Sequence, residues 1–96
     1  MPVLELAKLS VKADEQEPFE AAFAKARTYL QEAEGHLETH LTVSTAEEGV
    51  YVMLVRWRSV EDHVERFASS PGFGAFKDLI WGHFTSEPDV RHYQEI

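Results

Sequence analysis

The side chains best suited to chemistry are a histidine in the second half of the chain and several aromatic residues around it. His63 recurs with Val60, Val64 and Phe67 at the spacing of one helical face, so we expect its ring to point inward. An imidazole titrates near neutrality and can act as a general acid or base. The same position also suits a histidine that hydrogen-bonds within the core, and the sequence leaves both interpretations open.

A second pair of candidates, His92 and Tyr93, lies close to the end of the chain. Adjacent residues of a strand point to opposite faces, so we expect one of them to line a cavity while the other faces away. Both are candidate catalytic residues as proton donors or acceptors. Ordinary packing at a strand end is the alternative.

Six large aromatic residues could form the walls of a pocket for a flat aromatic ligand. They are Trp57, Phe67, Phe73, Phe76, Trp81 and Phe84. Aromatic residues at helical spacing also form plain hydrophobic core. Because indoles are seldom fully buried, we expect Trp57 and Trp81 to be pocket walls.

The sequence predicts neither a metal site nor a cofactor site. Without cysteine there is no thiolate ligand or thiol nucleophile. His36 and His40 would lie about 13 Å apart on a strand, too far for a shared metal ion. Gly72-Phe73-Gly74 lacks the third glycine and the preceding strand of a dinucleotide-binding loop.

Charge and hydropathy exclude several classes of partner. The formal net charge of −8 disfavours nucleic acid and anionic membrane surfaces. No apolar stretch approaches the length of a membrane span, and no signal peptide is evident. We therefore expect a soluble cytoplasmic protein.

The 96 residues predict one domain, 1–96, of the α+β class. Patterns of period two predict strands, and apolar residues at helical spacing predict helices. The expected strands are residues 3–11, 37–45, 50–57 and 89–96. The first expected helix starts at Pro18 and ends at Gly35, the second starts at Ser59 and ends at the break of residues 69–72, and the third follows that break and ends at Glu87-Pro88. The order βαββαβ, with its second helix broken in two, predicts a ferredoxin-like four-stranded antiparallel sheet.

The strand at 50–57 is apolar on both faces, which predicts a homodimer. Tyr51, Met53, Val55 and Trp57 lie on one face, and Val50, Val52 and Leu54 lie on the other. Helices in this fold cover one face of the sheet only. A second copy of the chain is the simplest cover for the other face.

The chain resembles the antibiotic biosynthesis monooxygenase family, whose members are dimeric α+β barrels. The resemblance covers nearly the whole chain and rests on Leu54 to His63, Phe67, Ser70-Pro71, Phe76, Pro88, Val90 and His92-Tyr93. Trp57 matches a tryptophan found in the oxygenating and the haem-degrading members. Haem degraders also use an asparagine on the first strand and a histidine on the last helix. Here Ala7, Lys8, Phe76 and Lys77 stand near those points, which argues against haem.

This resemblance implies a cofactor-free monooxygenase that acts on a small aromatic, quinol or polyketide-like molecule. His63 would be the base, His92 or Tyr93 a hydrogen-bond donor, and Trp57 a wall. Two alternatives remain at this point: an acid–base cyclase or isomerase, and a non-catalytic module that binds a small molecule and dimerises. Fold alone does not decide between them.

Overall fold

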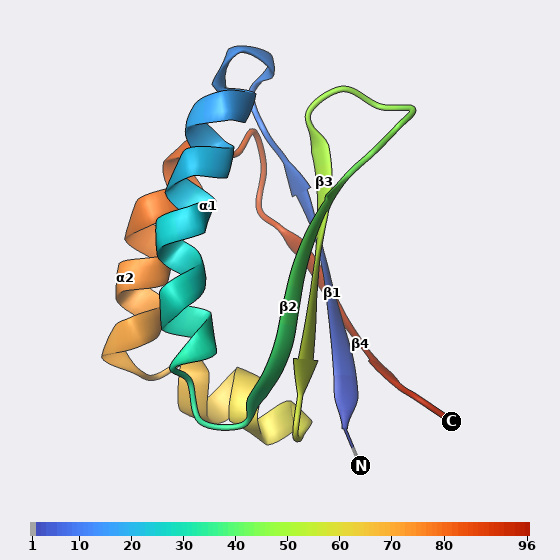
Figure 1. Cartoon of the computed structure of the whole chain (residues 1–96), viewed down its shortest axis with the longest axis vertical. Coiled ribbons are helices and arrows are strands. Elements are labelled where there is room, and N and C mark those ends of the chain that lie inside the picture. The colour runs from blue at the N-terminus through green and yellow to red at the C-terminus, as the bar shows by residue number, and fades with distance from the viewer. Residues whose placement is uncertain (1) are drawn as a thin grey trace.

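The computed structural model describes residues 2–96 as a twisted sheet with helices on one side of it (Figure 1). The strands are β1 (Val3–Ser10), β2 (His36–Val43), β3 (Val50–Trp57) and β4 (Asp89–Gln94). The α-helices are α1 (Gln16–Gln31) and α2 (Pro71–Ile80). Shorter helical elements are the 3₁₀ helices η1 (Ala13–Glu15) and η3 (Trp81–His83) and the π-helix η2 (Asp62–Phe67).

The sheet has the strand order β2-β3-β1-β4, and every neighbouring pair is antiparallel. The first and third strands therefore occupy the centre, and the last strand forms one edge. This arrangement is the ferredoxin-like α+β plan, so the predicted fold class is confirmed. The predicted strand boundaries differ from the observed ones by at most two residues.

The sheet has an inner face, which packs against the helices, and an outer face, which does not (Figure 1). Directly paired residues share a face. On the inner face, Val3, Glu5, Ala7 and Leu9 of β1 lie opposite Trp57, Val55, Met53 and Tyr51 of β3. All eight are buried. On the outer face, Leu4, Leu6, Lys8 and Ser10 lie opposite Arg56, Leu54, Val52 and Val50.

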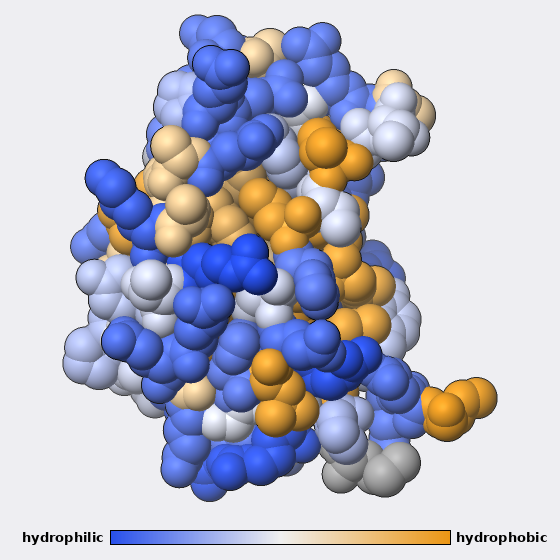
Figure 2. Space-filling model, viewed as in Figure 1, coloured by the Kyte–Doolittle hydropathy of each residue, from blue (hydrophilic) through white to orange (hydrophobic). Residues whose placement is uncertain are grey.

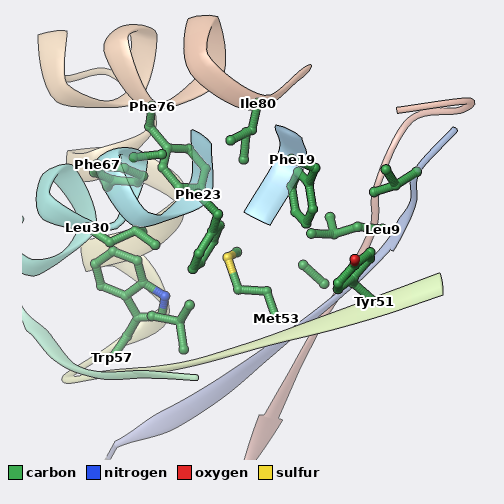
Figure 3. Close-up of a cluster of buried hydrophobic side chains, with 14 of the residues drawn as sticks. Leu9, Phe19, Phe23, Leu30, Tyr51, Met53, Trp57, Phe67, Phe76 and Ile80 are labelled. Carbon is green, nitrogen blue, oxygen red and sulfur yellow. The ribbon is translucent and has the colours of Figure 1, made fainter. Parts of the chain in front are cut away.

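Between the inner face and the helices lies the hydrophobic core (Figure 3). Helix α1 contributes Phe19, Phe23, Ala26 and Leu30, which recur at helical spacing on one buried stripe. Helix α2 contributes Phe76 and Ile80. Ser70 caps α2 by accepting a hydrogen bond from the Phe73 N–H, and Pro71 takes the first helical position, where its missing N–H costs nothing.

Helix α1 begins at Gln16, two residues before the start predicted at Pro18. The proline lies in the first turn, where the backbone N–H groups have no partner within the helix, so Pro18 does not interrupt it. The preceding acidic residues form η1, a separate turn of 3₁₀ helix. The pattern predicted the helix correctly, but the helix starts two residues earlier than expected and ends at Gln31, before Gly35.

The helix expected from Ser59 to Phe67 is largely not an α-helix. Residues 62–67 wind as a π-helix, and the Ala68 N–H donates to the carbonyl oxygen of His63, five residues earlier. The wider turn leaves Val64 46 % exposed, although the α-helical pattern had placed it on the buried face. Phe67 remains buried, and His63 still points inward.

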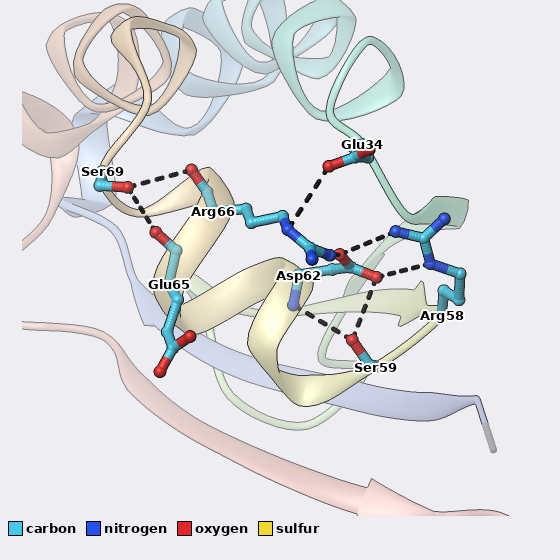
Figure 4. Close-up of polar contacts among 7 residues, drawn as sticks. All are labelled: Glu34, Arg58, Ser59, Asp62, Glu65, Arg66 and Ser69. Carbon is cyan, nitrogen blue, oxygen red and sulfur yellow. Dashed lines mark hydrogen bonds and ion pairs between the residues drawn. The ribbon is translucent and has the colours of Figure 1, made fainter.

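A buried aspartate fixes the start of this π-helix (Figure 4). Asp62 is fully buried and accepts hydrogen bonds from Arg58, Arg66 and the Ser59 hydroxyl. The Arg58 guanidinium, aided by Arg66 and Ser59, lowers the pKa of Asp62 to about 2. Its carboxylate packs against Gly35, where a Cβ atom would lie 2.2 Å from Oδ2 and where φ is +86°. Only glycine suits both the close approach and this φ.

The outer face keeps the apolar residues that the sequence indicated for it. Val50, Val52 and Leu54 of β3 are only partly buried there. Figure 2 shows hydrophobic residues reaching the surface along the sheet side of the molecule. In the part of the chain that the structure describes, no helix is long and apolar enough to cross a membrane.

Candidate active site

A cavity of about 220 Å³ lies between the inner face of the sheet and the helices. Among the described residues that line it, only Glu5, His63 and Glu87 are ionisable. The remaining lining residues are apolar or aromatic, and they are Ala7, Leu9, Leu30, Met53, Phe67, Phe73, Phe76, Ile80, Trp81, Pro88 and Val90. Such a cavity suits an apolar ligand that a few polar groups orient.

Glu5 lies in the middle of β1, beside this cavity, and is 2 % exposed. Its Oε1 accepts a hydrogen bond of 2.8 Å from Nε1 of Trp57. Burial disfavours the carboxylate and raises the pKa of Glu5 to about 7, although the Trp57 N–H opposes this shift. Near neutral pH, Glu5 therefore exists in both protonation states.

The second oxygen of Glu5 is available to a ligand. Within residues 2–96, Oε2 has no hydrogen-bond partner. Every fully buried side-chain oxygen or nitrogen there does have a partner, so Oε2 is not fully buried. Glu5 lines the cavity, and Oε2 is the oxygen that the Trp57 N–H leaves unbonded, so we infer that Oε2 faces the cavity. A hydroxyl or acidic C–H of a bound molecule could approach it there.

His63 connects Glu5 to the edge of the sheet. Its ring stacks on Trp57, with centroids 5.1 Å apart and an angle of 9° between planes. Nε2 of His63 lies 3.5 Å from Oε1 of Glu5, and Nδ1 lies 2.8 Å from Nε2 of His92. Burial, with a smaller contribution from His92, lowers the pKa of His63 to about 4. The ring is therefore neutral at pH 7, as expected from its buried position.

His92 is half-buried and lies on the edge strand β4, directly opposite Glu5. Its ring centroid lies 5.0 Å from that of His63. Glu5, His63 and His92 thus form a continuous polar cluster from the cavity to the edge of the sheet.

Five of the nine side chains predicted for the site line the cavity. They are His63, Phe67, Phe73, Phe76 and Trp81. His92 contacts the cavity only through His63. The expectation that His92 and Tyr93 point to opposite faces of the strand is confirmed.

Three of the predicted site residues lie elsewhere. Trp57 is fully buried behind His63 instead of forming a cavity wall, because Glu5 accepts its N–H inside the core. Phe84 lies past the end of α2 and packs against Phe19 and Trp81. Tyr93 is 49 % exposed and pairs with Leu4 on the outer face, because strand alternation directs it away from the cavity.

The sequence analysis missed Glu5, which is the most unusual residue of the cavity. A signal was present: Val3, Glu5, Ala7 and Leu9 share one face of a strand, and Glu5 is the only ionisable residue among them. A carboxyl group on a buried face costs free energy unless it has a partner or a function. Its partner, Trp57, is 52 residues away in the sequence and is identified only by the strand pairing.

The two histidines of β2 do not form a metal site. A register shift between His36 and Glu38 places His36 beside Trp57 on the inner face and His40 beside Leu54 on the outer face. The His36 ring packs edge-on against Trp57, with centroids 5.9 Å apart. Among residues 2–96, no group of three or more potential metal ligands occurs.

Known proteins resemble the chain over almost its whole length. An uncharacterized protein of Bacillus subtilis, YczJ, is 32 % identical over 94 residues, which cover 98 % of this chain and 99 % of YczJ. A solved Bordetella bronchiseptica structure, named for antibiotic biosynthesis monooxygenases, is 28 % identical with a TM-score of 0.96, covering 99 % of this chain and 97 % of that one.

SnoaB, a cofactor-independent oxygenase from Streptomyces nogalater, has the same fold. It gives a TM-score of 0.85 at 17 % identity, and the alignment covers 99 % of this chain and 93 % of SnoaB. The family model of antibiotic biosynthesis monooxygenases matches residues 2–79. This chain belongs to the antibiotic biosynthesis monooxygenase family.

Proposed function

We propose that the protein is a cofactor-independent monooxygenase of a small aromatic, quinol or polyketide-like molecule. The observation that carries this proposal is the apolar cavity with a buried glutamate and a partly buried histidine on its wall. Aromatic side chains suit a flat ring, and the cavity volume of about 220 Å³ favours a molecule with few fused rings.

The reaction requires the protein to remove a proton and to exclude water. Once deprotonated, an electron-rich aromatic supplies the electrons that reduce molecular oxygen. For an anthrone, the CH₂ carbon becomes a carbonyl, one oxygen atom enters the product and the other leaves as water. The protein must therefore supply a base and a site that excludes water. Glu5, His63 and His92 are the groups available as a base.

An oxygen electrode and a panel of quinols and anthrones test this function. We expect oxygen uptake that depends on both enzyme and substrate, and incorporation of one atom from ¹⁸O₂ into the product. His40→Ala, on the outer face, is the matched control and should retain full activity. Lack of oxygen uptake across the panel would contradict the proposal.

The second candidate is an acid–base cyclase or isomerase that uses the same cavity. The raised pKa of Glu5 next to a neutral His63 favours it, because proton transfer at neutral pH requires such groups. Turnover of a substrate under strictly anaerobic conditions would support this candidate over the oxygenase.

We also propose that the outer faces of two sheets pack together in a homodimer. The partly buried Val50, Val52 and Leu54 support this arrangement, since apolar sheet faces of monomers are normally covered. Sedimentation should give about twice the chain mass of 11.0 kDa. A strict monomer at micromolar concentration would contradict the dimer.

A further inference from the structure

We propose that Glu5 is the base of the cavity and that His63 and His92 carry the accepted proton to the solvent. This inference rests on the proposed function only in requiring that the cavity takes an acidic aromatic molecule. It replaces His63 as the proton acceptor and gives the histidine a transfer role. The evidence is the placement of three groups in one line from the cavity to the edge of the sheet.

Glu5 is the better placed acceptor because one of its oxygens is committed and the other is not. The Trp57 N–H holds Oε1 at 2.8 Å, which fixes the orientation of the carboxyl group. Oε2 has no hydrogen-bond partner among residues 2–96 and belongs to a residue that lines the cavity. His63, in contrast, is stacked on Trp57, and its Nδ1 is engaged by His92.

The electrostatic surroundings of Glu5 come from each element that packs around it. Trp57 of β3 donates a hydrogen bond, while His63 of η2 and His92 of β4 are the neighbouring bases. Glu87, at the end of the connection to β4, is the other carboxyl group on the cavity. Burial brings the pKa of Glu5 to about 7, so its carboxylate can accept a proton and release it again near neutral pH.

The proton transfer can be written with every proton accounted for. The bound aromatic gives H⁺ to Oε2 of Glu5 and keeps the electron pair. The Trp57 hydrogen bond fixes the carboxyl group only at rest; when that bond breaks, the carboxyl group can rotate and present this proton to Nε2 of His63, which lies 3.5 Å from Oε1 in the resting arrangement. His63 passes its Nδ1 proton across the 2.8 Å contact to Nε2 of His92, and His92 releases its own Nδ1 proton to water.

Anaerobic hydrogen exchange tests the base without requiring oxygen chemistry. The probe is 2-tetralone, a bicyclic ketone whose benzylic C–H next to the carbonyl is acidic and gives an enolate when a base removes the proton. In D₂O, the wild-type protein should accelerate deuterium uptake at that carbon, with a rate that rises as Glu5 ionises near pH 7. The Glu5→Gln variant should lose about 10²–10⁴-fold of this rate.

Matched variants make the result specific. Glu32→Gln changes an exposed carboxyl group at the end of α1, outside the cavity and the outer face of the sheet, and should leave exchange unchanged. Glu5→Asp keeps an acidic group and covers the case in which Glu5→Gln does not fold. For Glu5→Asp, the exchange rate should still rise with pH near neutrality but should be lower than that of the wild type. His92→Phe should slow exchange, and added imidazole should restore it by replacing the lost proton acceptor.

Two results would overturn the inference: wild-type exchange no faster than in buffer, or Glu5→Gln exchange as fast as wild type. A His92→Phe rate equal to wild type would overturn the exit path through the histidines. These outcomes are separate from the oxygen-electrode assay. Exchange that depends on Glu5, found together with no oxygen uptake, would keep this inference and reject the oxygenase.

Discussion

The two faces of the central strands carry similar residue types in opposite electrostatic situations. On the inner face, Glu5 and His63 are withdrawn from water, and burial moves the pKa of each toward its neutral form. On the outer face, Arg56 forms ion pairs with Glu38 and Glu95, whose side chains are 46 % and 52 % exposed. A glutamate thus has a raised pKa on the inner face, whereas the glutamates of the outer face form partly exposed ion pairs.

This difference arises from packing and not from residue identity. Glu5 and Arg56 lie on adjacent central strands, where Glu5 pairs with Val55 and Arg56 pairs with Leu4. Alternation turns one residue toward the helices and the other toward the uncovered face. The predictions below either break this contrast or make it quantitative.

The largest effect is expected for a histidine of the inner face. His63→Ala should lower turnover of an accepted quinol by roughly 10²–10⁴-fold, because it interrupts the path between Glu5 and His92. His40→Ala, on the outer face, should leave turnover unchanged. A lowered melting temperature with unchanged turnover per folded molecule would assign His63 to the core alone.

Removal of the buried indole should have the largest effect on stability. Trp57→Ala removes a fully buried side chain and leaves Oε1 of Glu5 without its donor. We expect a loss of about 3–5 kcal/mol in the free energy of unfolding. Urea denaturation followed by far-UV circular dichroism measures it, and a loss below about 1 kcal/mol would show that the indole is not a core anchor.

The pH dependence of stability should show two opposite slopes. The raised pKa of Glu5 means that its stabilising contribution is complete below pH 4.5 and declines by about 3 kcal/mol as pH rises to 7. The lowered pKa of His63 means that its contribution is complete above pH 6.5 and declines by about 3 kcal/mol as pH falls to 4. In the wild type the two largely cancel.

Single variants should reveal each slope. For Glu5→Gln, the free energy of unfolding should rise with pH between 4 and 6.5. For His63→Ala, it should fall with rising pH between 4.5 and 7. Denaturant titrations at several pH values measure both slopes, and parallel curves for the two variants would refute the assigned pKa directions.

The outer face should respond least. Arg56→Ala removes ion pairs that are partly exposed, for which about 0.2–1 kcal/mol is typical. Added salt should reduce the difference further. Urea denaturation at a protein concentration that keeps the chain monomeric measures this loss, and a value above about 2 kcal/mol there would contradict the assignment of these ion pairs as weak exposed pairs.

Local patterns predicted the fold well because the residues that decide it are close in sequence. Alternation in 50–57 and helical spacing in 19–30 are each readable from a short window. Such patterns correctly predicted that His63 points inward and that His92 and Tyr93 point to opposite faces of the sheet. The sequence resemblance pointed to the correct family.

The site itself required distant pairings that no window contains. The partner of Glu5 is Trp57, and that contact depends on the register between β1 and β3. The π-helical winding at 62–67 also has no simple period, so Val64 was assigned to the wrong side. Trp57 was expected to be a cavity wall, but its indole N–H donates to Glu5, and this hydrogen bond permits complete burial. That contact also depends on the pairing of distant strands.

The π-helix makes the cavity sensitive to chain length more than to composition. A π-turn holds one residue more than an α-turn, and each residue of an α-helix advances by about 100°. We expect deletion of one residue between His63 and Phe67 to restore ordinary α-helical winding, with Asp62 still holding the start of the turn and the sheet unchanged.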